Sequence, residues 1–451
     1  MSELDTQPAD STHLAPDGET APVNNTPARK AMFVVVLVMF IDLLGFGIVL
    51  PLLPRYGESF LKPVLGQEYA WLEHPLLGLL MASFSAMQFL FAPLWGRLSD
   101  RVGRRPFLLL GLTGSVVFYG LFGFASDWGE VEGRQLIGLI LLFVARIGQG
   151  VAGATVSTAQ AVIADCTTPE KRSRGMALIG AAFGVGFTFG PLIGALALVL
   201  APAHPGGPGY AAAAISGVAL VLAVGMMPET LRPGSTAGHR RGWLNVGGLR
   251  LALDTPTVAL LILTFFLATL AFASFEPTLA LVTKDVLRYS DEGNFLVFAY
   301  VGVVLMFAQG GLYQVLARRG VSEISFMLAG AALMAVGLGS LGGVSFLASR
   351  GPDAPTHGQL LGGVLAAVAV AVVGFAFLTP SVQALISRRS DPGRQGEILG
   401  VNQSANAMSR ILGPVLGLGL YGVLPSHALP NVFSVVLLLA VVLLTLRARH
   451  K

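Results

Sequence analysis

The sequence predicts an all-α polytopic membrane protein, with twelve transmembrane helices in two six-helix parallel repeats around a central cavity. Three observations predict this fold: an apolar composition, twelve long apolar runs and an internal repeat. Of the 451 residues, 54% are hydrophobic and only 12% are charged, which is about half the charge of an ordinary soluble domain. A surface with so little charge is suited to lipid rather than to water.

Each apolar run is long enough to cross a bilayer, whose core requires about 20 helical residues. The runs begin near Ala31, Leu76, Pro106, Gln135, Gly175, Tyr210, Pro256, Asn294, Ser325, Gly358, Gly396 and Pro430. Because the connections are mostly short, we expect one helical bundle and no separate soluble domain. The expected parts are a disordered cytoplasmic tail (1–30), a six-helix half (31–230), a central cytoplasmic loop (231–254) and a second six-helix half with a short cytoplasmic tail (255–451).

The two halves repeat one another in sequence. Residues 160–194 align with residues 383–417 at a constant offset, with eight identities in 35 positions. The repeat includes "GPLIG" at 190–194 and "GPVLG" at 413–417. Two six-span halves in the same orientation are related by an axis along the membrane normal, an architecture of transporters whose substrate site lies between the halves near the midplane.

The basic residues predict the orientation of the chain. If the amino terminus is cytoplasmic, the connections on that side hold 21 of the 29 Lys and Arg residues, because six lie on the other side and two lie inside spans. Cytoplasmic loops retain Lys and Arg, so this bias predicts that both termini are cytoplasmic. The same bias explains the net charge of +4, so we expect no nucleic-acid partner.

No pattern in the chain is typical of an enzyme or a metalloprotein. Cys166 is the only cysteine, which excludes an intrachain disulfide, and Cys-based metal spacing is absent. No GxxxxGK[ST] loop for binding nucleotide phosphates occurs. We therefore expect no metal, no cofactor, no enzymatic activity and no ATP drive.

Several motifs follow one another along the chain. They are "DLLGFGIVLPLLP" (42–54), "GRLSDRVGRR" (96–105), "RIGQG" (146–150), "GVGFTFGPLIG" (184–194) and "PET" (228–230). In this order they resemble the major facilitator superfamily, and specifically its drug/proton antiporters of the tetracycline-exporter kind, over roughly residues 31–447. The resemblance implies a multi-pass protein of the cell (inner) membrane that acts as a monomer on a small-molecule substrate and protons.

The loop at residues 96–105 is expected to gate the cytoplasmic side, as the resemblance implies. An acid in this loop is not needed for topology, but the positive N-terminal end of a helix attracts one. The resemblance assigns that contact to Asp100 and the eleventh predicted span, which begins near Gly396, in the outward-open state. The second half has Gln314 where the first has Asp100, so it lacks the matching acid. The candidate gate residues are Gly96, Asp100, Arg101, Gly103, Arg104 and Asp165.

Four ionisable residues fall well inside the predicted spans: Asp42, Arg146, Glu276 and Arg410. A charge in a span costs roughly 3 kcal/mol or more, so each one indicates a function. Each half contributes one acid and one base, and we consider the pairs Asp42 with Arg146 and Glu276 with Arg410. Asp42 lies about twelve residues into helix 1, near mid-membrane, and is the first candidate to carry the proton.

Structural explanations stay open for all four charges. Asp42 can form a hydrogen bond between the first and fourth predicted spans, Arg146 can be an anchor, Glu276 can face water at the cavity mouth and Arg410 can be a packing residue. The Gly/Pro residues of helix 5 (Gly186, Gly190, Pro191 and Gly194) let helices approach closely in any membrane protein. Candidate cavity residues are Gln149, Gln160, Asn402 and Asn406.

Three functions compete. The favoured one is proton-coupled efflux of small amphipathic organic compounds, such as tetracycline-like drugs. The alternatives are a metabolite importer or facilitator on the same fold, since fold does not determine function, and a membrane receptor or scaffold without transport. The last alternative leaves the four buried charges without a use.

We predict that the central loop and the chain termini are cytoplasmic. Single cysteines at Ser235 and Ser426, in a Cys166→Ser background, should react with an impermeant thiol reagent from the inside and from the outside of the cell, respectively. Labelling of intact cells and of inverted vesicles measures this directly. The reverse pattern would contradict the predicted orientation.

Overall fold

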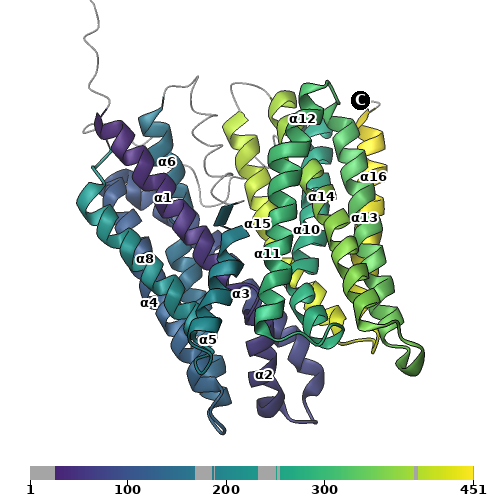
Figure 1. Ribbon diagram of the computed structural model, residues 1–451. Helices are drawn as coiled ribbons and strands as arrows, with labels where there is room; N and C mark the ends of the chain where they lie inside the picture. The colour runs from purple at the N-terminus through teal and green to yellow at the C-terminus, as the bar shows by residue number, and fades with distance from the viewer. Residues whose placement is uncertain are drawn as a thin grey trace, which may run out of the picture.

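The computed structural model describes residues 26–167, 185, 186, 188–231, 250, 254–390 and 395–449. Throughout this part of the chain the regular structure is helical (Figure 1). The labelled helices are α1 (Thr26–Val49), α2 (Leu53–Leu65), η1 (Ala70–Leu72), α3 (Glu73–Val102), α4 (Arg104–Gly129), α5 (Gln135–Gly153), α6 (Val156–Cys166), α8 (Gly207–Met226), α10 (Pro256–Asp285), α11 (Asp291–Phe307), η2 (Ala308–Leu312), α12 (Tyr313–Arg318), α13 (Glu323–Ala348), η3 (Gly351–Asp353), α14 (His357–Arg389), α15 (Gln395–Tyr421) and α16 (Leu429–Arg449).

Ten helical stretches among the described residues are long and apolar enough to cross a membrane. The Thr188–Leu200 helix and α15 correspond to the other two predicted spans. α15 is less apolar because it carries Asn402, Asn406 and Arg410 among its aliphatic residues. The predicted start of the fifth span, near Gly175, lies outside the described residues.

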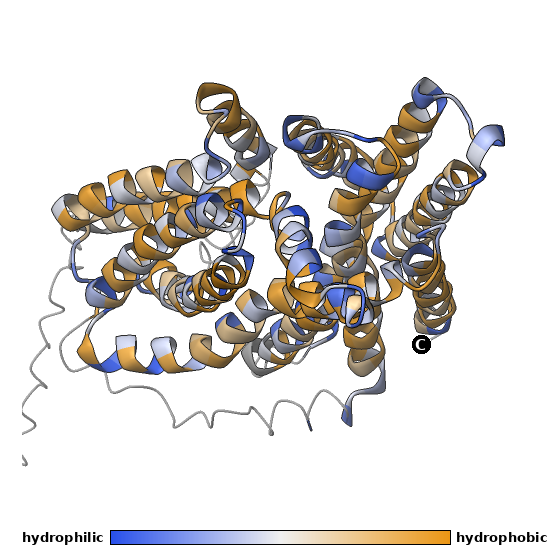
Figure 2. Cartoon of the chain, turned by 90° about the horizontal axis from the view of Figure 1, so that it is seen from below, coloured by the Kyte–Doolittle hydropathy of each residue, from blue (hydrophilic) through white to orange (hydrophobic). Residues whose placement is uncertain are grey.

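The helices form two groups that follow the two halves of the sequence. α1 to α8 pack on one another in the first half, and α10 to α16 do so in the second. Figure 2 shows the two groups side by side in a view along the bundle. Both ends of the described chain lie at one end of the bundle, here called the terminal end (Figure 1). The other end, where α2 lies, is called the opposite end. The all-helical, two-repeat fold expected from the sequence is therefore confirmed.

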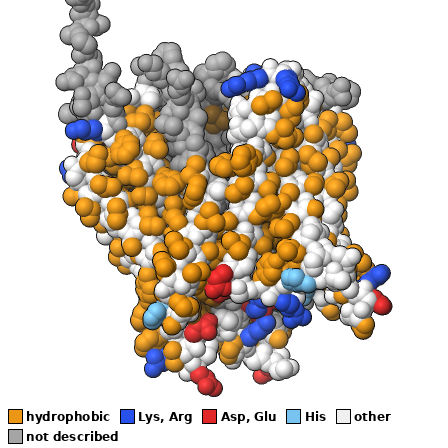
Figure 3. All heavy atoms as spheres, in the orientation of Figure 1, with side chains coloured by type: hydrophobic (Ala, Val, Ile, Leu, Met, Phe, Trp, Pro, Cys, Tyr) orange, Lys and Arg blue, Asp and Glu red, His pale blue; other side chains and the backbone are white. Residues whose placement is uncertain are grey.

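The halves share a hydrophobic core. The larger cluster of buried apolar side chains includes Phe60 of α2, Leu281 of α10 and Tyr421 of α15, so it joins both halves toward the opposite end. A smaller cluster, which includes Val34 and Ile163, belongs to the first half alone. Figure 3 shows apolar side chains over the middle of one face and charged ones gathered toward the opposite end, as expected for a protein surrounded by lipid.

The Thr188–Leu200 helix packs unusually closely on its neighbours. A Cβ atom added to Gly190 would lie 2.7 Å from the main-chain carbon of Gly47 in α1. A Cβ added to Gly194 would overlap the ring of Phe295 in α11, which belongs to the other half. Small residues permit such contacts in membranes, where close van der Waals packing drives helix association.

We predict that Gly190→Ala lowers the free energy of unfolding by about 1–3 kcal/mol, because the added methyl group has no room against the α1 backbone. Thermal unfolding of the purified protein in detergent measures the loss. The matched control is Gly225→Ala in α8, where an added Cβ meets no described atom within 4 Å. Alanine favours helix over glycine, so the control should be neutral or stabilising. Equal melting temperatures for both variants would contradict the close contact.

Candidate functional site

A cavity lies where the two halves face one another. It encloses about 330 Å³, including the space through which it opens to solvent. α1, α3 and α5 line it from the first half, and α10 and α15 line it from the second. The lining residues are Phe46, Leu50, Met81, Ser85, Arg146, Ala273, Glu276, Pro277, Arg410 and Pro414. Three of the four charges predicted inside the spans thus meet in one cavity.

Arg146 is almost completely enclosed, with 1% of its surface exposed. One terminal nitrogen donates to the side-chain oxygen of Gln149 at 3.0 Å, and Gln149 in turn donates to the main-chain carbonyl of Phe118 at 3.2 Å. The guanidinium also lies over the ring of Phe84, 4.7 Å from its centre. Gln149, predicted as a cavity residue, therefore holds Arg146 in place.

Arg410 reaches across the boundary between the halves. Its guanidinium carbon lies 5.4 Å from the ring centre of Phe46 on α1, a distance typical of a cation–π contact. It also interacts electrostatically with Glu276 of α10. The structure thus brings together the acid and the base of the second half.

Asp42 has a different neighbour from the one considered on sequence grounds. Its carboxylate accepts a hydrogen bond from the Ser115 hydroxyl of α4 at 2.8 Å, and Tyr119 donates to its main-chain carbonyl at 3.3 Å. The ion pairs of the described residues do not include Asp42 with Arg146. The packing of α1 turns Asp42 toward the third span, whereas Arg146 faces the cavity from the fourth.

The remaining predicted cavity residues lie at varied depths. Gln160 on α6 and Asn406 on α15 are half-buried. Asn402 on α15 is buried, and its side-chain oxygen meets no hydrogen-bond donor within the described part of the chain. These three residues lie outside the set that lines the cavity.

The predicted gate loop is a compact polar cluster at the terminal end. Arg104 is buried and forms ion pairs with Asp100 and with Asp165, its Nε lying 3.2 Å from the Asp165 carboxylate. Gly103 has a φ of +123°, so the turn between α3 and α4 favours glycine. Arg101 is exposed, and Gly96 faces Ser157 of α6. In this conformation the ion pair of Asp100 is formed within its own loop.

Glu229, a residue of this cluster that the sequence patterns did not single out, joins the loop to the end of α8. Its carboxylate accepts hydrogen bonds from the main-chain N–H groups of Arg104 and Arg105, at 2.9 and 3.1 Å, at the N-terminus of α4. Burial alone would raise the pKa of Glu229, but these bonds and those from residues 230 and 231 hold it below its ordinary value. The "PET" motif could have indicated this contact, because it contains Glu229 and an acidic side chain is stabilised at the N-terminus of a helix.

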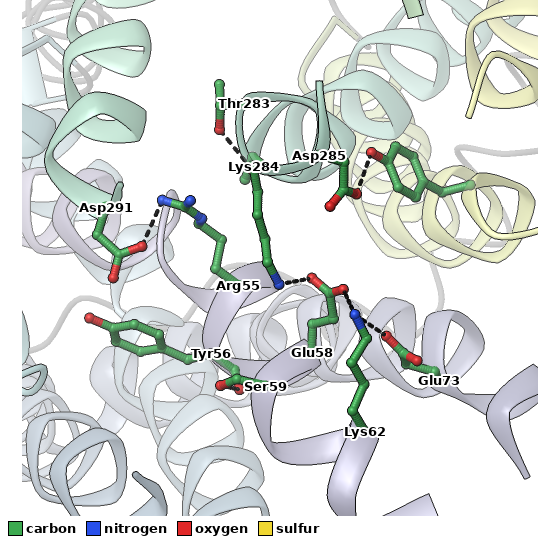
Figure 4. Close-up of polar contacts among 12 residues, drawn as sticks. Arg55, Tyr56, Glu58, Ser59, Lys62, Glu73, Thr283, Lys284, Asp285 and Asp291 are labelled. Atoms are coloured by element: carbon green, nitrogen blue, oxygen red, sulfur yellow. Dashed lines mark hydrogen bonds and ion pairs between the residues drawn. The ribbon is translucent and has the colours of Figure 1, made fainter. Parts of the chain in front are cut away.

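A second group that the sequence patterns missed holds the halves together at the opposite end (Figure 4). We call Arg55, Glu58, Lys284 and Asp291 the opposite-end latch. Arg55 lies 2.6 Å from the Asp291 carboxylate, and Lys284 lies 2.7 Å from that of Glu58, so two ion pairs cross from α2 to the second half. Arg55 also donates to the carbonyl of Tyr289.

The latch sits in a wider set of polar contacts. Glu58 forms a second ion pair with Lys62 one turn along α2, and Asn294 of α11 donates to the carbonyl of Pro51 at 2.7 Å. Burial raises the pKa of Glu58, but hydrogen bonds from Lys284 and Lys62 outweigh it and hold the pKa below its ordinary value of 4.5. On sequence grounds the basic residues of the latch were topology signals only, since no local pattern reveals a partner more than 200 residues away.

Comparison with known proteins gives a consistent picture. The family model described as Major Facilitator Superfamily matches residues 35–351. The human major facilitator superfamily domain-containing protein 10 is 28% identical over 457 residues, covering 93% of both chains. The class C tetracycline resistance protein of Escherichia coli is 29% identical over 394 residues, covering 87% of this chain and 90% of that one.

Solved structures agree on the fold. The human organic anion transporter MFSD10 (TETRAN) is similar with a TM-score of 0.60 and 26% identity, over 93% of this chain and 99% of that one. A D-xylose-proton symporter is similar with a TM-score of 0.71 and 17% identity, over 92% of this chain and 97% of that one. At that identity the second likeness concerns the fold alone.

We predict that Glu58→Gln lowers the free energy of unfolding by roughly 1–3 kcal/mol at neutral pH, because two charge-assisted hydrogen bonds weaken. The pKa of Glu58 is depressed in the folded protein. Its contribution is therefore complete above the unfolded pKa and is lost as pH falls through the folded pKa. The difference between wild type and variant should stay constant from about pH 8 to about pH 5 and shrink only in more acid solution.

Thermal unfolding of purified wild-type and variant protein across that pH range measures this effect. The matched control is Glu68→Gln, which changes an exposed glutamate nearby and should leave stability unchanged. A difference that already disappears near neutral pH would mean that the lysines do not hold Glu58 in its ionised form.

Proposed function

The chain belongs to the major facilitator superfamily, and on that premise we propose that it exports small amphipathic organic compounds from the cytoplasm in exchange for protons. The observation that carries the proposal is the charged cavity between the halves, beyond which the opposite end is held shut by ion pairs. The tetracycline resistance proteins and the organic anion transporter among its relatives support a substrate of this kind.

The two ends of the bundle support alternating access. For the cavity to open at the opposite end, the two ion pairs of the latch must break, because they join the two halves. The gate loop would then close the terminal end, with Asp100 leaving Arg104 to meet the start of α15. The loop is suited to this exchange because Glu229 and Asp165 anchor its other residues independently of Asp100.

Asp42 is our candidate for the proton-carrying group. It lies in the first span four residues before the cavity residue Phe46, which places both on the same face of α1. The Ser115 hydroxyl stabilises its charged form without a fixed ion pair. An acid in this state can bind a proton and release it again with little rearrangement. Glu276 is the second candidate, because it faces the cavity directly.

The proposal includes an orientation and a location. We place the terminal end in the cytoplasm, the opposite end outside, and the protein in the cell (inner) membrane as a functional monomer. The charge bias of the connections supports the orientation. In this orientation the latch lies on the outer side of the membrane, where its ion pairs join the two halves.

Inverted membrane vesicles test the proposed antiport. When acidified vesicles carrying the protein receive tetracycline or another amphipathic compound, a pH-sensitive dye should report proton efflux that depends on that compound. Vesicles without the protein provide the baseline. No response to any compound in a broad panel would reject proton-coupled export.

We predict that Asp42→Asn abolishes proton-driven accumulation while exchange of substrate down its own gradient persists. The amide oxygen still accepts the Ser115 bond, so the fold is kept, but the side chain no longer binds a proton. The initial rate of proton-driven uptake into the same vesicles should fall at least about tenfold, a barrier change of roughly 1.4 kcal/mol.

Ser115→Ala separates the two effects of this change. This change removes the hydrogen bond from Ser115 to Asp42 but leaves the Asp42 carboxyl group. Proton-driven accumulation should therefore continue, with an altered dependence on pH. If Asp42→Asn still drives uphill efflux with unchanged pH dependence, the coupling role belongs to another residue, and Glu276→Gln is the next variant to measure.

A further inference from the structure

Two guanidinium groups from different halves share the central cavity. Arg146 enters it from α5 and Arg410 from α15. They lie over the adjacent rings of Phe84 and Phe46, whose centres are 5.4 Å apart. The two cations are close enough to repel one another.

Arg146 has spare capacity to bind an anion. Its Nε–H group is buried and meets no acceptor among the described residues, while a terminal nitrogen of the same guanidinium is occupied by Gln149. A buried donor of this kind costs free energy unless a ligand or water accepts from it. The guanidinium that carries this donor belongs to a residue of the cavity lining.

The charges of the cavity do not balance. Glu276 is the one acid among the described lining residues, and it interacts with Arg410, its neighbour in the second half. Asp42 is directed to Ser115 on α4 and lies outside the lining. With its charged residues ionised, the lining therefore carries an excess of one positive charge, and Arg146 is the lining cation whose charge no lining acid offsets.

Apart from Ser85, the remaining lining is apolar. Phe46, Leu50 and Met81 face the same space as the guanidiniums, and this space opens to solvent. Such a site matches a compact molecule with one charged end and one apolar or aromatic body.

We propose that the cavity binds the carboxylate of a small amphipathic organic anion, with Arg146 as its main contact and Arg410 as a second contact from the other half. The guanidinium of Arg146 donates from Nε to the carboxylate, and the apolar body lies against Phe46, Leu50 and Met81. The anion offsets the repulsion between the two arginines and contacts both halves. This inference deepens the proposed export function and rests on it for the biological role of the site.

Equilibrium binding to the purified full-length protein in nanodiscs tests the inference without a proton gradient. The probe is tritiated 1-naphthaleneacetate, and the competitors are unlabelled 1-naphthaleneacetate and its uncharged amide. The acid should compete at least about tenfold better than the amide, because only the acid is an anion able to accept charge-assisted hydrogen bonds.

Variants locate the contact. Arg146→Gln should weaken binding of the acid at least about tenfold, and Arg146→Lys should restore part of it, because lysine keeps the charge without the planar fork. Arg350→Gln removes an exposed arginine at the opposite end and should bind as the wild type does. Size-exclusion chromatography and thermal unfolding establish that each variant is folded.

Two outcomes overturn the inference. Equal competition by acid and amide, or absence of saturable binding of the acid to wild type, shows that the cavity does not select an anion; this result needs no variant. Unchanged affinity of folded Arg146→Gln shows that the anion binds elsewhere. Failure of proton-driven transport with selective acid binding intact would instead reject the proposed antiport and leave the binding site standing.

Discussion

A charged side chain inside a membrane-spanning helix is stable only where another polar group or water meets it, and this constraint organises the molecule. The four charges within the spans all lie toward the interior rather than toward lipid. Arg146, Arg410 and Glu276 converge on one cavity between the halves, and Asp42 is hydrogen-bonded within the first half. The proposed substrate site and proton site are consequently adjacent but distinct, which suits an exchanger that must hold one ligand while it releases the other.

α1 and its continuation α2 connect the functional parts. Asp42 and Phe46 lie one turn apart on α1, Phe46 supports Arg410, and Arg55 of α2 forms part of the latch. α1 also packs backbone to backbone against the Thr188–Leu200 helix at Gly190. A rotation of the first half would thus act at once on the proposed proton site, the cavity and the opposite end. Close-packed contacts of this kind transmit movement because they do not deform gradually.

The two ends of the bundle differ in how they are held. At the opposite end, ion pairs and apolar side chains of different halves make the contact, and each ion pair joins one buried group, Arg55 or Glu58, to one partly exposed group, Asp291 or Lys284. At the terminal end, Glu229 binds main-chain N–H groups of α4, which keeps the gate loop in shape within its own half. In the proposed mechanism, the opposite end separates and the terminal end presents a rigid surface to a partner helix.

Hydropathy, charge bias and the internal repeat are local properties of the sequence, so by themselves they determine the all-helical class, the membrane spans and the two halves. They also single out Arg146, Glu276 and Arg410, because a charge among apolar residues stands out in any helix. The sequence does not determine which charges meet. Asp42 lies by Ser115 rather than Arg146, and Arg55 reaches Asp291, because the rotation and tilt of packed helices decide these distances. Only the tertiary structure joins residues so far apart in the chain.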